Sequence, residues 1–99
     1  MDAMWTRFFP IMAKVRSYIE TGAIGDVRMI SADFGFRGGA DPDERALNPD
    51  LAGGALLDVG VYPIAFVFMI LGKPQRIESI PDIGETGVDE QATILFGYD

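Results

Sequence analysis

The longest apolar stretch of this 99-residue chain, Val59–Leu71, decides where its core has to lie. It is too short to cross a bilayer, which takes about 20 apolar residues, so it predicts a helix buried in a globular domain. The helical pattern begins at Gly53 and is interrupted at Gly60 and Pro63. Because proline has no N–H and its ring crowds the preceding turn, we expect a kink or a restart of the helix at Pro63.

The rest of the chain alternates between helical and extended patterns. Apolar residues recur every four positions over Pro10–Glu20, which predicts an amphipathic helix. Residue types predict strands over Val27–Phe36, where both faces are partly apolar, over Gln75–Ile80 and over the alternating segment 91–98. The order helix, strand, loop, helix, strand, strand predicts an α+β fold. In it, helices pack on one face of a mostly antiparallel open sheet.

Composition removes several classes of function. Because the chain has no cysteine and no histidine, disulfides, thiolate catalysis and the commonest zinc ligands are excluded, and we expect no metal. A net charge of −7 with scattered basic residues argues against nucleic acid and acidic membranes as partners. No signal-peptide pattern opens the chain, so we expect a cytoplasmic protein that spans no membrane.

The segment Gly38–Asp50 predicts a long loop. Its thirteen residues include two glycines, two prolines and several carboxylates. So long a segment without regular structure favours a binding loop or a lid. The carboxylates lack the spacing of a calcium loop, which indicates a solvated acidic loop, and Pro81–Gly87 predicts a second, turn-rich link.

Asp58 and Tyr62 form a candidate catalytic pair. Four positions apart on a helix, they share one face, where a carboxylate can hold a phenol in place or relay its proton. The alternative is that Asp58 caps a helix start and Tyr62 is an ordinary core aromatic. A second group of aromatic and basic residues predicts either a pocket for a polar ring substrate or ordinary packing. Its members are Trp5, Arg7, Phe8, Phe9, Phe34, Phe36 and Arg37.

Five blocks of the sequence carry a resemblance to a known family. They are Ala3–Phe8, Gly22–Arg28, Ala32–Arg37, Gly53–Pro63 and Gly84–Gln91. In order and spacing these blocks resemble the C-terminal part of the Gfo/Idh/MocA oxidoreductases, which include glucose-fructose oxidoreductase and inositol dehydrogenase. Within that family they look most like the branch of the dimeric dihydrodiol dehydrogenases and D-xylose dehydrogenases.

The resemblance implies a role for several residues. In that family an N-terminal Rossmann domain binds NAD or NADP, the substrate lies between the two domains, and the open sheet forms the subunit interface. Tyr62 would then be the proton donor or acceptor to the substrate hydroxyl, with Asp58 beside it. Trp5 and Phe34 would line the substrate pocket, and Arg28 would contribute to subunit contact.

The sequence itself contains no Gly-x-Gly-x-x-Gly fingerprint after a strand, so we expect no cofactor to bind this chain alone. We expect residues 1–99 to be a partial, truncated C-terminal domain for substrate binding and oligomerisation, without the Rossmann domain and inactive by itself. The parent would be an NAD(P)-dependent oxidoreductase acting on a secondary alcohol of a sugar, polyol or cyclic diol. The alternative is a non-catalytic self-association module. Under either alternative, the unpaired edge strand of the truncated sheet predicts a homodimer or larger assembly.

Overall fold

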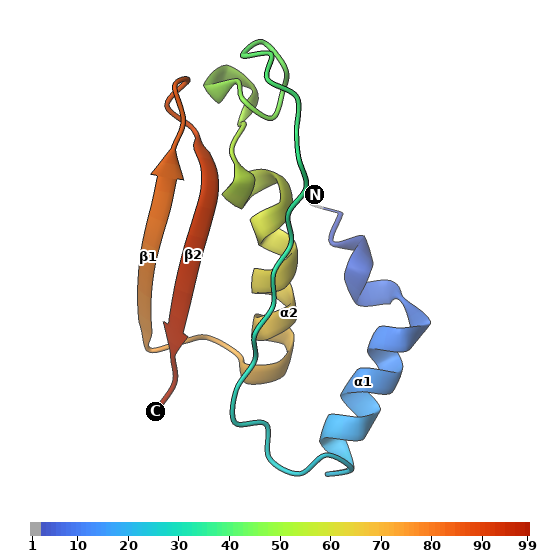
Figure 1. The fold of residues 1–99 in the computed structure, drawn as a ribbon. Helices are drawn as coiled ribbons and strands as arrows, with labels where there is room; N and C mark the ends of the chain where they lie inside the picture. The colour runs from blue at the N-terminus through green and yellow to red at the C-terminus, as the bar shows by residue number, and fades with distance from the viewer. Residues whose placement is uncertain (1–2) are drawn as a thin grey trace.

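The computed structural model describes residues 3–99 and has an α+β architecture. The hairpin of two antiparallel strands lies beside helix α2, and helix α1 lies on the far side of α2 from the hairpin (Figure 1). This confirms the expected fold class. The elements are, in chain order, a 3-10 turn (Trp5–Phe8), α1 (Pro10–Glu20), a 3-10 turn (Pro49–Leu51), a π-helical turn (Leu56–Gly60), α2 (Val61–Leu71), β1 (Arg76–Ile83) and β2 (Asp89–Gly97).

Helix α1 begins and ends where the sequence predicts. Pro10 occupies its first turn, where a missing N–H costs no intrahelical hydrogen bond. Gly22, just past the end, has a φ of 70°, which lies in the left-handed region that glycine adopts without strain. Both ends of this helix therefore follow from local sequence.

The predicted interruption of the second helical stretch is confirmed. A π-helical turn, Leu56–Gly60, runs directly into α2, and Pro63 falls in the first turn of α2, where its missing N–H is tolerated. Gly72 ends the helix with a φ of 73°. The irregularity therefore lies just before the proline, in the turn that carries Asp58.

The expectation of a buried helix is wrong, because α2 contains no fully buried residue. Two strands present too little surface to cover a helix, and the contact with them is local: the rings of Phe68 and Phe96 meet edge to face at 5.8 Å between centroids. Val88, in the hairpin turn, is the one buried hydrophobic side chain among the described residues. The core of residues 3–99 is therefore small.

The helical stretch is also longer than Val59–Leu71, the segment that the sequence analysis judged too short to cross a bilayer. Pro49–Leu71 comprises 23 residues and contains an 18-residue window with a mean hydropathy of 2.0, which by length and composition suffices to cross a membrane. Core helices of soluble proteins share these properties. Ala52 and Gly54 have positive φ values of 55° and 113°, so this stretch is not one continuous α-helix.

The hairpin is longer than predicted. Strand β1 extends past Ile80 through Pro81 to Ile83, because proline is tolerated at the edge of a sheet. The register pairs Arg76 with Gly97 and shifts between Asp82 and Ile83. The connection expected over Pro81–Gly87 therefore shortens, and Gly84 N–H and Val88 C=O close its tight end at 2.9 Å.

The segment Val27–Phe36 is extended but is not a strand, so this prediction is wrong for the residues described. Within residues 3–99 no backbone hydrogen bond pairs it with another segment, and it runs alongside α2 (Figure 1). Met29 and Phe36 are 80% and 64% exposed, so the segment is not buried on both sides either. Residue types favour an extended backbone, but only a neighbouring strand makes it part of a sheet.

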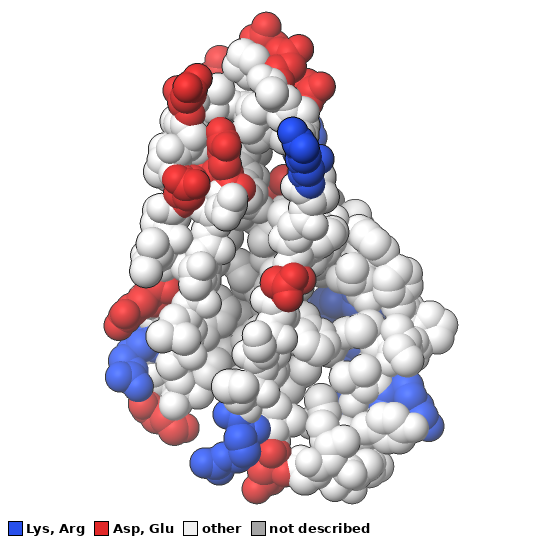
Figure 2. Space-filling model, viewed as in Figure 1, with Lys and Arg blue, Asp and Glu red and all other residues white. Residues whose placement is uncertain are grey.

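The acidic side chains of the face seen in Figure 2 gather mostly at one end of the molecule, where the hairpin turn and the loop Gly38–Asp50 lie. That loop is largely irregular, as predicted. Basic side chains are scattered on this face and form no continuous patch. The distribution agrees with the net charge of −7.

Candidate functional site

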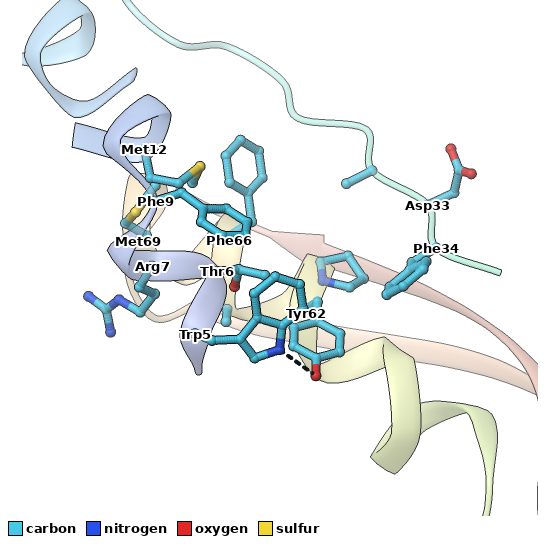
Figure 3. A pocket seen from close by; sticks show the side chains of 13 residues that line it. Trp5, Thr6, Arg7, Phe9, Met12, Asp33, Phe34, Tyr62, Phe66 and Met69 are labelled. Carbon is cyan, nitrogen blue, oxygen red and sulfur yellow. Dashed lines mark hydrogen bonds between the residues drawn. The ribbon is translucent and has the colours of Figure 1, made fainter. Parts of the chain in front are cut away.

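A cavity of about 390 Å³ lies where the N-terminal turn, the extended segment and the start of α2 meet. Its walls are mainly aromatic and aliphatic side chains (Figure 3). Such a lining suits the faces of a ring-shaped ligand better than a strongly charged group. The lining residues are Trp5, Thr6, Arg7, Phe9, Met12, Ala32, Asp33, Phe34, Tyr62, Pro63, Ala65, Phe66 and Met69.

Trp5 and Tyr62 meet at one side of this cavity. The indole Nε1 donates a hydrogen bond to Tyr62 Oη at 3.1 Å, drawn as the dashed line in Figure 3. The two rings pack edge to face, with centroids 5.7 Å apart. Phe9 packs edge to face on the same indole at 5.1 Å. The N-terminal turn is therefore tied to the first turn of α2, 57 residues away.

Phe34 flanks Tyr62 from another element. The two ring centroids lie 5.7 Å apart, and Phe34 belongs to Val27–Phe36, the extended segment that was predicted to be a strand. The structure thus brings three of the predicted site residues, Trp5, Phe34 and Tyr62, to one cavity from three separate segments. Their roles in binding and proton transfer stay predictions.

Asp58 lies outside this cavity. It lines a second, adjoining hollow bounded by the extended segment, α2 and β2, and its carboxylate forms an ion pair with Arg45. The hydrogen bond that Arg45 donates to Asp58, and then the negative charge of Asp58, raise the pKa of Arg45 above its usual value. Asp58 and Tyr62 were predicted to share one helix face, with the carboxylate beside the phenol. In the structure they lie on the same helical stretch but line different hollows, and in the described residues no hydrogen bond joins them.

The predicted basic residues are not gathered around the phenol. Arg7 lines the cavity, but its guanidinium points away from Trp5 and Tyr62 (Figure 3). Arg37 and Arg28 line the second hollow, on the extended segment. Their roles in substrate binding and in subunit contact stay predictions.

Sequence reasoning missed Arg45 and several members of the cavity wall. Arg45 is the only basic residue of the acidic loop Gly38–Asp50, which was a usable signal that it has a specific partner. Phe66 and Met69 come from α2 and face Met12 of α1 (Figure 3). Within the described residues no group of three or more acidic side chains comes together as a metal site.

Comparison with known proteins bears on this geometry. Residues 12–99 match the family of the GFO/IDH/MocA C-terminal domain. The chain belongs to this family. As a member it shares 44% identity with the mouse protein named trans-1,2-dihydrobenzene-1,2-diol dehydrogenase, 43% with the human protein and 42% with that of Xenopus laevis, each over 99% of this chain. The chain spans 29% of the mouse and human relatives and 30% of the frog relative.

The GFO/IDH/MocA match confirms the resemblance seen in the sequence. It covers most of α1, all of α2 and both strands, and with them nine of the thirteen residues that line the cavity. Trp5, Thr6, Arg7 and Phe9 precede the matched range, and the mouse relative aligns over nearly the whole chain, including that end. The relatives are dehydrogenases by name, which supports an oxidoreductase family.

Proposed function

We propose that this chain supplies substrate-binding and proton-transferring residues to an NAD(P)-dependent dehydrogenase that oxidises a secondary alcohol of a cyclic diol, sugar or polyol. The observation that carries the proposal is the hydroxyl of Tyr62, which is held by Trp5 at the side of an aromatic cavity. The names of the relatives, trans-1,2-dihydrobenzene-1,2-diol dehydrogenases, favour a cyclic diol within this class.

Oxidation of a secondary alcohol removes a hydride from carbon and a proton from oxygen. A nicotinamide, when bound, supplies the hydride acceptor, which no side chain provides. Tyr62 Oη takes this proton: as a phenolate it accepts the proton of the substrate hydroxyl during oxidation, and in the reverse reduction the phenol returns it. Because the indole N–H of Trp5 is only a donor, it occupies one lone pair of Tyr62 Oη, favours the phenolate and leaves another lone pair for the proton of the substrate.

The cavity walls bind and orient the ring of the substrate. Trp5, Phe9 and Phe34 offer apolar ring faces and edges, against which the C–H faces of a cyclic diol or sugar pack. Asp58, already engaged by Arg45, acts as a fixed charge beside the site rather than as the proton acceptor.

The donor set of the cavity fits a ring but not the pyrophosphate of a dinucleotide. Arg7 directs its guanidinium away, and Asp33, whose carboxylate also points outward, would repel phosphate (Figure 3). We therefore assign the phosphates of NAD or NADP to a separate cofactor domain, as the family resemblance implies.

We also propose that the protein acts in the cytoplasm as a homodimer or larger assembly. The outer face of the hairpin supports the assembly, because Ile80 and Leu95 are 76% and 68% exposed there. Apolar side chains at this exposure favour contact with another protein surface. The second candidate function is self-association without catalysis. A module of that kind would not need the cavity around Tyr62, which is why we favour the dehydrogenase.

The test uses the protein in which this domain is joined to its cofactor domain. Oxidation of trans-1,2-dihydrobenzene-1,2-diol and of D-xylose is followed through the absorbance of the reduced nicotinamide. The variant Tyr62→Phe should lower kcat by about 10² to 10⁴, the range of general acid–base catalysis. Residues 1–99 alone should neither bind NAD(P) nor turn over. Tight cofactor binding by this chain, or full activity of the variant, would refute the proposal.

A further inference from the structure

A carboxylate on the hairpin reaches the beginning of the helical stretch that carries Tyr62. Asp89, the first residue of β2, accepts a hydrogen bond through Oδ2 from the backbone N–H of Leu56 at 2.7 Å. The first N–H groups of a helix have no partner within the helix. Neither Ala55, which precedes the π-helical turn, nor Gly60, which precedes α2, provides a side-chain cap. The cap therefore comes from another element, 33 residues away in the sequence.

The approach of Asp89 depends on the absence of a side chain at residue 54. A Cβ on Gly54 would overlap Asp89 Oδ1, and the φ of 113° is itself one that other residues rarely adopt. Gly53, its neighbour, lies under the loop, since a Cβ there would come within 2.8 Å of the Ala46 carbonyl oxygen. The two glycines, both buried, thus admit the hairpin on one side and the loop on the other.

The hairpin holds the helical stretch at two points. Asp89 caps its beginning at Leu56, and Phe96 packs on Phe68 near its end, with ring centroids 5.8 Å apart. A negative charge near the first turn is also favoured by the helix dipole. Two separated attachments fix both the position and the rotation of the segment between them. Tyr62 lies in that segment.

We infer that Asp89 is a positioning residue for the proposed proton transfer. By fixing Leu56, it sets the start of the helical stretch and hence where Asp58 and the hydroxyl of Tyr62 lie relative to the cavity. Asp89 does not touch the cavity itself. The inference rests on the proposed function, because the step that it positions is the transfer of a proton at Tyr62.

The first arm of the test measures the cap without any turnover. Hydrogen exchange of the peptide that spans residues 54–60 is followed by mass spectrometry in the full-length protein. Asp89→Ala should exchange about 5- to 30-fold faster, the range that corresponds to the loss of one helix cap. Asp89→Asn keeps an acceptor oxygen of the same shape and should restore most of the protection. Asp82→Ala, a matched loss of charge on β1 of the same hairpin, should exchange like the wild type.

The second arm measures positioning. Asp89→Ala should lower kcat about tenfold and change KM less, because the walls at Trp5 and Phe34 stand on other segments. Asp89→Asn should recover most of kcat, which a merely destabilised fold would not do selectively. Unchanged exchange in Asp89→Ala, or faster exchange with unchanged kcat, would overturn the inference. A wild type without turnover refutes the proposed function and the positioning role with it, and exchange still decides whether the cap exists.

Discussion

Replacing Tyr62 by phenylalanine removes one oxygen and leaves the ring in place. The ring contacts to Trp5 and Phe34, each 5.7 Å between centroids, are kept. What is lost is the hydrogen bond from Trp5 Nε1, 3.1 Å long. Trp5 is 51% exposed, so water can take the place of the phenol oxygen. The loss in unfolding free energy should therefore lie near the low end of the usual range, about 0.5 kcal/mol.

The effect on catalysis should be much larger. If Tyr62 Oη carries the proton, its loss raises the barrier by about 3 to 5 kcal/mol, which is a factor of about 10² to 10⁴ in kcat. The two quantities differ so widely that they separate a chemical role of the hydroxyl from a structural one. Urea unfolding and steady-state turnover are measured on the same preparation.

Tyr18→Phe provides the control. Tyr18 lies on α1, is 47% exposed and has Lys14 Nζ 4.7 Å from its ring centroid. It does not line the cavity, so its hydroxyl takes no part in the proposed chemistry. This variant should change neither quantity. A Tyr62→Phe protein that loses more than about 2 kcal/mol of stability, or that keeps its wild-type kcat, would show that the hydroxyl is structural and that the reasoning is wrong.

Three other substitutions test the packing around the site. Gly54→Ala should cost about 2 to 4 kcal/mol in unfolding free energy, from backbone strain and steric overlap, whereas Gly35→Ala, with open space at its Cβ, should be nearly neutral. Phe68→Ala should cost about 1 to 2 kcal/mol, less than a fully buried phenylalanine because it is 40% exposed, and should speed hydrogen exchange in β2. Arg45→Ala should hardly move the thermal midpoint, since its side chain is 60% exposed, but should lower kcat by releasing Asp58. Because the partner carboxylate raises the pKa of Arg45 above its ordinary value, the arginine stays charged at neutral pH, and its own titration adds no pH dependence there.

The parts of the fold that depend on neighbouring residues could be predicted from the sequence. Proline at the start and glycine after the end define Pro10–Glu20, and Gly72 stops the second helix. The strand Val27–Phe36 could not be predicted in the same way. Its residue types set an extended backbone, but pairing is a property of two segments, and within residues 3–99 the second one does not lie beside it.

The site residues, too, could be predicted only in part. The resemblance identified Trp5, Phe34 and Tyr62 from their place in family blocks, and the structure brings these three together. The partners of Asp58 and Leu56 were not foreseen. Each contact is a single hydrogen bond between segments 13 or 33 residues apart, and the chain offers 15 acidic residues from which such a contact could be formed. Local pattern does not choose among them.

One wall of the cavity stands on backbone whose peptide groups, within the described residues, bond to no other segment. Phe34 belongs to that extended segment, and a segment held by so few bonds opens at little free-energy cost. Whatever pairs with this backbone would therefore steady the aromatic wall without touching the ligand. Linkage then works in both directions: a ligand that binds better against a steadied Phe34 strengthens that pairing by the same factor. Pairing of another strand with this extended segment and binding of a ligand beside Phe34 are therefore thermodynamically coupled.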